Sequence, residues 1–135
     1  MRSSLYFELN QVDSLTLTEI RGIGPVLSRR IIRYRDQLGG FVSFQQLGEV
    51  YGLTEDVREN LKAHSFLSDS PVRKLKINEA SLDELRQHPY IGYRKARVIV
   101  NYRLQHGRFT SIDALSKINL MDSLSLDKLA PYLSL

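Results

Sequence analysis

The chain has 135 residues, of which 42% are hydrophobic and 25% charged, so its composition is that of one ordinary domain or two small ones rather than of a large catalytic architecture. It has no cysteine, which excludes disulfides, iron–sulfur clusters, thiol nucleophiles and cysteine-based zinc sites. Its longest apolar runs, such as Val98–Val100, fall far short of the roughly 18 residues that cross a bilayer, so we expect no membrane contact from these residues.

The net charge of +4 is small, but the basic residues are segregated. The stretch from Ile20 to Arg35 contains five arginines and no acid, and the stretch from Leu85 to Ile112 contains six bases and no acid. Two acid-free windows therefore hold eleven of the nineteen bases. Such clustering is typical of a surface that meets a polyanion.

The sequence repeats itself with a period of 68 residues, without a gap from Asn10–Leu53 to Asn78–Met121. The identical pairs include Asn10/Asn78, Gly24/Gly92, Arg29/Arg97, Tyr34/Tyr102, Gly39/Gly107 and Phe41/Phe109. We therefore expect two copies of one unit, at residues 1–64 and 75–135, joined by a linker at 65–74 that is rich in Ser, Asp and Pro.

A short helix is the first element expected in each copy. Asp13 and Ser81 are good N-caps for it. Its buried face would be formed by Leu17 and Ile20 in the first copy, and by Leu82 and Leu85 in the second.

A longer helix follows Gly24 in the first copy and Gly92 in the second. Apolar residues recur at helical spacing, and the basic residues lie on the opposite arc. In the first copy the apolar stripe is Leu27, Ile31, Ile32, Tyr34 and Leu38, and the basic arc is Arg29, Arg30 and Arg33. Glycine at 39–40 and at 107 should end these helices in a left-handed conformation.

Arg35 and Arg103 adjoin the packed tyrosines Tyr34 and Tyr102. A capping or ion-pair role within each unit is therefore favoured for these two arginines over contact with an external partner. The tyrosines themselves are expected in the core rather than as stacking platforms.

Two further short helices complete each copy after Phe41 or Phe109 returns to the core. Ser43 and Gln46 form a capping-box pattern for the third helix, and Ser111 offers the same N-cap without the N3 partner. Thr54 or Asp122 can cap the fourth helix. No stretch shows sustained period-two alternation, so a sheet is not expected.

The turn Gly22-Ile23-Gly24 between the first two helices has the composition of an anion site. Two glycines around one aliphatic anchor allow a tight turn and leave amide groups bare at the start of the next helix, with Pro25 at its first position. Bare amides and the helix dipole together suit a phosphate. The alternative is a tight helix–helix turn that binds nothing, and the neighbouring arginine run favours phosphate contact over it.

The Asn before the first helix, the Gly-Ile-Gly-Pro turn, the Ile-Ile-x-Tyr-Arg and Ile-Val-x-Tyr-Arg segments and the Gly-x-Phe corner are joined by Leu-x-x-Val or Leu-x-x-Ile in the third helix. Together these features resemble the helix-hairpin-helix family, in particular the tandem units of proteins similar to the competence DNA-uptake protein ComEA. The resemblance covers about residues 7–64 and 75–133. It implies an all-α fold of two tandem helix-hairpin-helix units, each of about four short helices.

The resemblance also implies binding of double-stranded DNA without sequence preference, through hairpin amides on phosphates. The only cofactor it implies is a monovalent cation held in some members by hairpin carbonyls.

Two departures weaken the motif: Leu27 stands where the family has Lys, and Tyr90 replaces the first glycine of the second hairpin, whose Lys95 is retained. The later hairpins, 50–53 and 118–121, lack the paired glycines, so we expect them to be structural.

The residues expected to bind DNA are Gly22, Ile23, Gly24, Ser28, Arg29, Arg30, Arg33, Ile91, Gly92, Tyr93, Arg94, Lys95 and Arg97. No catalytic residue, metal site or enzyme activity is expected. The isolated His64, His88 and His106 are interpreted as structural, and Glu55, Asp56 and Glu59 as acids that complement a helix N-terminus.

The alternative function is a protein-interaction or dimerisation scaffold, with a protein partner or a second copy in place of DNA. Apolar linker residues such as Phe66 and Leu67 would be available for it. Salt dependence distinguishes the two functions, because binding through phosphates weakens steeply with salt and apolar binding does not.

Overall fold

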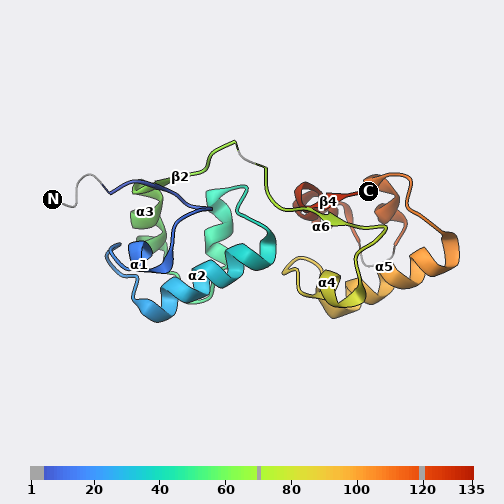
Figure 1. The fold of residues 1–135 in the computed structure, drawn as a ribbon, viewed down its shortest axis with the longest axis horizontal. Coiled ribbons are helices and arrows are strands. Elements are labelled where there is room, and N and C mark those ends of the chain that lie inside the picture. The colour runs from blue at the N-terminus through green and yellow to red at the C-terminus, as the bar shows by residue number, and fades with distance from the viewer. Residues whose placement is uncertain (1–4, 70, 119–120) are drawn as a thin grey trace. The chain divides into compact units, whose positions relative to one another are not determined.

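A computed structural model describes residues 5–69, 71–118 and 121–135. The chain divides into two compact helical units, the first formed mainly by residues up to Pro71 and the second mainly by Val72–Leu135 (Figure 1). Each unit has the expected succession of four short helices, so the all-α prediction is confirmed.

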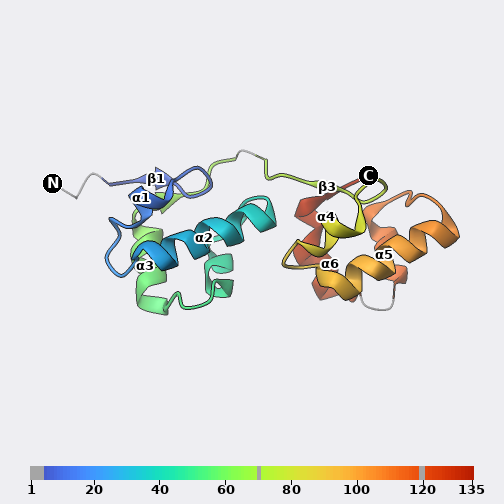
Figure 2. The ribbon, with the colours of Figure 1, turned by 60° about the horizontal axis from the view of Figure 1, so that its bottom comes forward.

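In the first unit the strand β1 precedes the helices and the strand β2 follows them. The elements in chain order are β1 (Phe7–Glu8), α1 (Ser14–Leu17), α2 (Pro25–Leu38), the 3₁₀ helix η1 (Phe44–Glu49), α3 (Glu55–Ala63) and β2 (Ser65–Phe66). β1 and β2 pair in parallel, with Phe7 opposite Ser65, and so join the start of the unit to its end (Figure 2).

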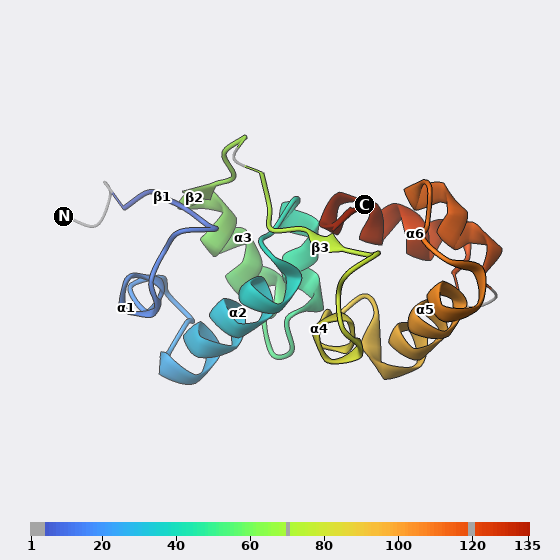
Figure 3. The ribbon, with the colours of Figure 1, turned by 45° about the vertical axis from the view of Figure 1, so that its right-hand side comes forward.

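The second unit repeats this order and adds one 3₁₀ turn before its last strand. Its elements are β3 (Leu75–Lys76), α4 (Leu82–Arg86), α5 (Gly92–His106), η2 (Ile112–Lys117), α6 (Ser123–Leu129), η3 (Ala130–Tyr132) and β4 (Leu133–Ser134), seen in yellow to red in Figure 3. β3 and β4 pair in parallel, with Leu75 opposite Leu133.

The strand pairs correct the expectation that no sheet forms. Each strand is two residues long, too short to leave a period-two pattern in the sequence. β2 also lies within residues 65–74, where the sequence predicted a linker, and Ser65 is buried.

The two cores are built from equivalent residues. Most side chains that are buried in one copy are buried 68 residues later in the other, as in the pairs Leu17/Leu85, Ile31/Ile99, Phe41/Phe109 and Leu47/Leu115, although buried Leu38 corresponds to exposed His106. α2 and α5 end at Leu38 and His106, and the glycines that follow have φ angles of +97° and +83°, as the sequence predicted.

The predicted N-caps are in place. Asp13 Oδ1 accepts from the Thr16 amide at 2.7 Å, and Asp122 Oδ1 accepts from the Ser125 amide at 2.7 Å. Ser43 closes a capping box with Gln46, and Ser111 caps η2 alone. Thr54 lies at the N-cap of α3, but its side chain makes no capping hydrogen bond.

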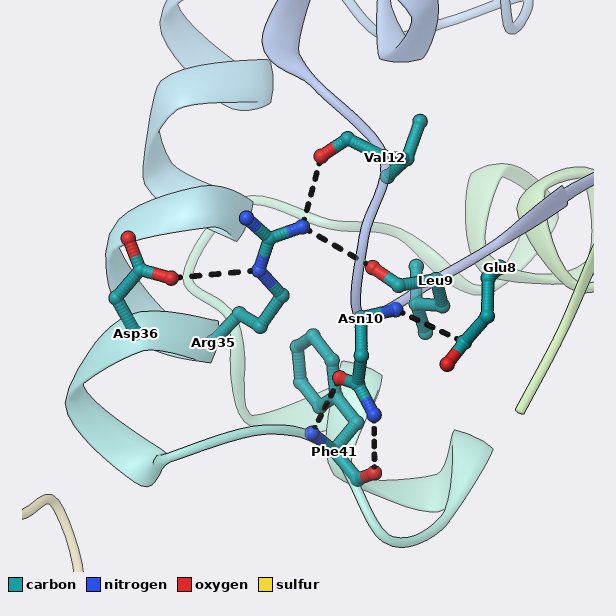
Figure 4. A network of polar contacts seen from close by, with 7 residues as sticks. All are labelled: Glu8, Leu9, Asn10, Val12, Arg35, Asp36 and Phe41. Atoms are coloured by element: carbon teal, nitrogen blue, oxygen red, sulfur yellow. Dashed lines mark hydrogen bonds and ion pairs between the residues drawn. The ribbon is translucent and has the colours of Figure 1, made fainter. Parts of the chain in front are cut away.

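In the first unit a polar lock, formed by Arg35 and Asn10 with the backbone groups that they bind, holds the first segment to the long helix and to Phe41 (Figure 4). Arg35 Nη1 donates to the carbonyls of Val12 at 2.8 Å and Leu9 at 3.2 Å. The Asn10 side chain pairs with the Phe41 backbone in both directions, at 2.7 and 2.9 Å. This confirms the expectation that Arg35 acts within the unit, although it binds two carbonyls of the first segment and does not cap a helix.

The second unit contains the same lock. Arg103 Nη1 donates to the carbonyls of Ile77 and Ala80, and Asn78 pairs with the Phe109 backbone in both directions. Arg103 therefore also has its expected role within the unit. Arg35 and Arg103 lie near the C-terminal ends of α2 and α5. The N-terminal ends of these helices take no part in the locks and adjoin the hairpins.

Candidate functional site

The first hairpin runs from Ile20 to Gly24, between α1 and α2. Ile23 is 4% exposed and anchors the turn, and its amide donates to the Ile20 carbonyl at 3.0 Å. Gly22 has a φ of +97°, and a Cβ there would lie 2.6 Å from Val57 Cγ2. Gly24 has an ordinary φ, and a Cβ there would meet nothing within 4 Å. The turn is thus packed on one side at Gly22 and open at Gly24.

Backbone amides at this turn are available to a ligand. In the part of the chain that the structure describes, the amides of Gly22, Gly24, Val26 and Leu27 make no hydrogen bond, and the helical ladder begins with Ser28 donating to the Gly24 carbonyl. Unpaired amides and the positive end of a 14-residue helix give this end of α2 a field that favours an anion.

Ser28, predicted to bind DNA, lies inside the unit. Its side chain is fully buried, and its hydroxyl donates to the Ser14 carbonyl at 2.7 Å. Ala96, the equivalent residue in the second copy, is also fully buried. This position therefore packs the first helix against the second and offers no group to the surface.

The three arginines predicted beside the first hairpin differ in their surroundings. Arg29 and Arg33 are exposed and make no ion pair within the described residues. Arg30 Nη1 instead donates to the Tyr51 carbonyl at 2.7 Å, and its Cζ lies 5.0 Å from the centroid of the Tyr51 ring. Arg30 thus holds the later turn, Val50–Leu53, against α2. Its positive charge nevertheless remains on the basic arc of α2.

The second hairpin turns differently from the first. No described non-glycine residue has a positive φ, so Tyr90 adopts an ordinary backbone conformation where Gly22 does not. The left-handed residue is instead Gly92, with φ +70°. The amides of Ile91 and Gly92 both donate to the His88 carbonyl, at 3.0 and 3.1 Å. Gly24 and Gly92 are equivalent in sequence, but in the part of the chain that the structure describes the Gly92 amide has a partner and the Gly24 amide has none.

The second hairpin still leaves backbone amides without a hydrogen bond at the start of α5, among the described residues. Within the described residues, those of Tyr93 and Arg94 make no hydrogen bond. Arg94 and Arg97 are exposed, and Arg97 Cζ lies 5.7 Å from the centroid of the Tyr93 ring. The two hairpins therefore share a bare amide at the equivalent positions 26 and 94.

Sequence reasoning missed Lys128 at the second hairpin. Lys128 and Lys95 line a cavity of about 200 Å³ together with Pro89, Tyr90 and Ser125. Lys128 Nζ lies 4.9 Å from the centroid of the Tyr90 ring. The only signal in the sequence was one Lys in the last helix, which no local pattern connects to a turn nearly forty residues earlier.

Asp122 weakens the positive field at the second hairpin. The hydrogen bond from the Ser125 amide, and secondarily the charge of Lys95, hold the pKa of Asp122 below its ordinary value of 3.8. The carboxylate is therefore charged at neutral pH. The equivalent residue in the first copy is Thr54, which is uncharged.

Three of the remaining candidate residues, Glu55, Asp56 and His64, lie at the termini of α3. Glu55 and Asp56 are in the first turn of α3, where they complement its dipole. His64 is the C-cap of α3, and its Nδ1 lies 3.0 Å from the Leu5 carbonyl. Among the described residues there is no group of three or more His, Cys, Asp or Glu placed to hold a metal. Asn119 and Leu120, in the last hairpin, lie outside the described residues.

No helix in the described ranges is long and apolar enough to cross a bilayer. No solved structure matches the chain significantly.

The curated relatives are vertebrate proteins. The chain is similar to "Endonuclease/exonuclease/phosphatase family domain-containing protein 1" of Danio rerio (28% identity over 139 residues), Mus musculus (23% over 150) and Xenopus laevis (25% over 142). Each match covers 90% of this chain but only 25–26% of the relative. The similarity therefore spans about a quarter of those proteins.

A family model described as "Helix-hairpin-helix motif" matches the chain twice, at residues 6–65 and 71–134. These two ranges coincide with the two helical units, and each contains one of the hairpins described above. The motif is in general associated with nucleic-acid binding. The narrower likeness to competence DNA-uptake proteins stays a prediction, whereas the double match shows that the chain belongs to the helix-hairpin-helix family.

Proposed function

We propose that this protein binds double-stranded DNA through the phosphate backbone and without sequence preference. The observation that carries the proposal is the N-terminal end of α2. There, within the described residues, the amides of Gly24, Val26 and Leu27 make no hydrogen bond and the exposed Arg29 and Arg33 make no ion pair. Amide and guanidinium groups that contact phosphates position a protein on DNA but carry no information about base sequence.

The second hairpin contributes a further set of the same groups. The bare amides of Tyr93 and Arg94 lie beside the charges of Arg94, Lys95 and Arg97. Asp122 opposes these charges, so we propose that the first hairpin provides the larger share of the affinity.

Gly24→Val tests the hairpin mechanism directly. Gly24 has an ordinary φ and an open surrounding, so valine fits the fold but covers the neighbouring amides. The matched control is Gly48→Val in η1, because Gly48 also lacks a positive φ and its nearest heavy atoms, on Arg58, are 3.9 Å from a Cβ built there. Gly92→Val is unsuitable, since Gly92 has a φ of +70° and the substitution would strain the turn.

Fluorescence anisotropy with random-sequence duplex DNA at several salt concentrations is the measurement. We expect log K to fall with log salt at a slope of about −0.9 per phosphate contact, Gly24→Val to bind more weakly, and Gly48→Val to bind as the unchanged protein does. Equal binding by the two variants would overturn the hairpin mechanism. No duplex binding at low salt would overturn the proposal in favour of an interaction scaffold.

We propose further that the chain itself has no catalytic activity. The name of the curated relatives refers to an endonuclease/exonuclease/phosphatase domain, but the matched region is a quarter of their length and corresponds here to the two helical units. Incubation of labelled duplex with the protein and Mg²⁺ tests this, and a cleaved product would refute it.

A cofactor is not part of the proposal. Phosphate binding serves DNA uptake, repair and recombination equally, so the proposal names the activity and no pathway.

A further inference from the structure

Tyr51 is the most exposed large hydrophobic side chain among the described residues of the first unit. It lies in the Val50–Leu53 turn, and 82% of it is accessible to solvent. Arg30 approaches one face of its ring, 5.0 Å from the centroid, and fixes the turn by donating to the Tyr51 carbonyl. The guanidinium thus holds the tyrosine at the edge of the basic face of α2, and the exposure of the ring leaves its other side to solvent.

The second unit presents a similar pair at a different position. Tyr93, in the first turn of α5, is 54% exposed, and Arg97 lies 5.7 Å from its ring centroid. In the repeat, Tyr51 corresponds to Asn119 and Tyr93 to Pro25. Neither tyrosine is therefore required to build the unit, yet each unit carries an exposed Tyr–Arg pair.

A solvent-exposed tyrosine at a phosphate-binding surface has a specific chemical use. Its ring offers a flat apolar face on which a nucleobase can stack, and such stacking tolerates any base because every base has a π face. An arginine on the opposite face adds a cation–π contribution and brings charge for the adjoining phosphate. In an intact duplex the base faces are stacked on one another, so only an unpaired base can reach the ring.

We propose that Tyr51 and Tyr93 are stacking platforms for unpaired bases, so that the protein prefers DNA with single-stranded ends or stretches over blunt duplex. This inference rests on the proposed function, because the hairpins hold the backbone beside which the bases are presented. The expectation that tyrosines belong to the core is separate from this inference. That expectation concerned Tyr34 and Tyr102, which are partly buried and contact Phe41 and Phe109.

The absence of tryptophan from the chain makes stacking visible. Tyr51→Trp introduces a single tryptophan, whose emission a stacked base quenches. The matched control is Leu104→Trp, because Leu104 is 79% exposed but lies in the last turn of α5, at the opposite end from the hairpin. We expect single-stranded oligonucleotides to quench the emission of the Tyr51→Trp variant but not that of the Leu104→Trp variant, and blunt duplex to quench neither.

Affinity measurements with alanine and phenylalanine variants complete the test. Tyr51→Ala removes one stacked ring and should weaken binding to a single-stranded oligonucleotide about tenfold. Tyr51→Phe keeps the ring and should change that affinity less than about twofold. Binding of blunt duplex by Tyr51→Ala should change less than about twofold, since phosphate contacts remain. Circular dichroism of each variant verifies the fold.

The outcomes separate the two proposals. If the emission of the Tyr51→Trp variant is not quenched, or if Tyr51→Ala weakens single-stranded and duplex DNA equally, stacking is refuted while duplex binding stands. If the unchanged protein binds no duplex but single-stranded DNA still quenches the Tyr51→Trp variant, the proposed duplex function fails and the platform survives. If neither form of DNA binds, both are refuted.

Discussion

Arg29 and Arg30 are adjacent in sequence, but the structure predicts opposite consequences for their removal. Arg29 is exposed and makes no ion pair in the described part of the chain, whereas Arg30 donates to the Tyr51 carbonyl at 2.7 Å and stacks on its ring. Arg29→Ala should leave stability unchanged and reduce the slope of log K against log salt by about 0.9, the loss of one phosphate contact.

Arg30→Ala should instead cost stability. The hydrogen bond to the partly exposed carbonyl contributes about 1 kcal/mol and the cation–π contact about 0.5 kcal/mol. For a unit of this size, each kcal/mol lowers Tm by roughly 4–8 °C, so a decrease of about 6–12 °C is expected in the transition of the first unit. Arg30→Ala should reduce the salt slope less than Arg29→Ala does, because the Arg30 guanidinium is already bound to the Tyr51 carbonyl and ring.

Thermal melting by circular dichroism and salt-titrated anisotropy measure the two effects on the same variants. Arg33→Ala provides a second exposed arginine on the same helix and should behave as Arg29→Ala does. If Arg30→Ala melts at the same temperature as the unchanged protein, Arg30 does not stabilise the turn. If Arg29→Ala leaves the salt slope at its original value, Arg29 makes no phosphate contact.

Three further substitutions test the interior and the second hairpin. Ser28→Ala removes the hydrogen bond to the Ser14 carbonyl and should lower stability by about 1 kcal/mol without changing DNA affinity, measured by urea unfolding and anisotropy; a loss of affinity without a loss of stability would contradict this. Gly92→Ala places a side chain at a φ of +70° and should cost about 1–2 kcal/mol in the second unit, whereas an unchanged urea midpoint would show that the turn is not left-handed. Asp122→Asn keeps an N-cap but removes the negative charge near Lys95, so duplex affinity should rise about twofold at low salt, and an unchanged or lower affinity would argue against phosphate contact at this hairpin.

Local interactions are the part of this structure that the sequence predicts well. Asp13, Ser43 and Ser111 cap helices within three residues of themselves, and the left-handed glycines follow directly from the helix ends. The repeat adds the expected core, since apolar residues that recur after 68 positions, such as Leu17, Ile31 and Phe41, are buried in both copies.

The parts that were missed depend on non-local contacts. The engagement of Arg30 with Tyr51 crosses 21 positions, and the cavity between Lys95 and Lys128 joins a hairpin to the last helix. Ser28 looks like a surface serine in the sequence, but the packing of α1 on α2 buries it. Helical periodicity states which arc a residue occupies and does not state which other segment covers that arc.

The two copies differ in where they place the cations that follow the hairpin and not in how many they place there. Their structural locks are the same, with Arg35 and Arg103 binding the equivalent carbonyls. Each hairpin is also followed by three cations, namely Arg29, Arg30 and Arg33 in the first copy and Arg94, Lys95 and Arg97 in the second.

In repeat numbering, the cations of the second copy correspond to positions 26, 27 and 29, so their mean position is about one helical turn closer to the bare amides. A partner that reads a fixed pattern of donors would demand the same positions in both copies. A phosphate backbone presents negative charge at many points and imposes no such demand. The retention of charge with a shift in its position therefore favours backbone contact over recognition of a defined sequence.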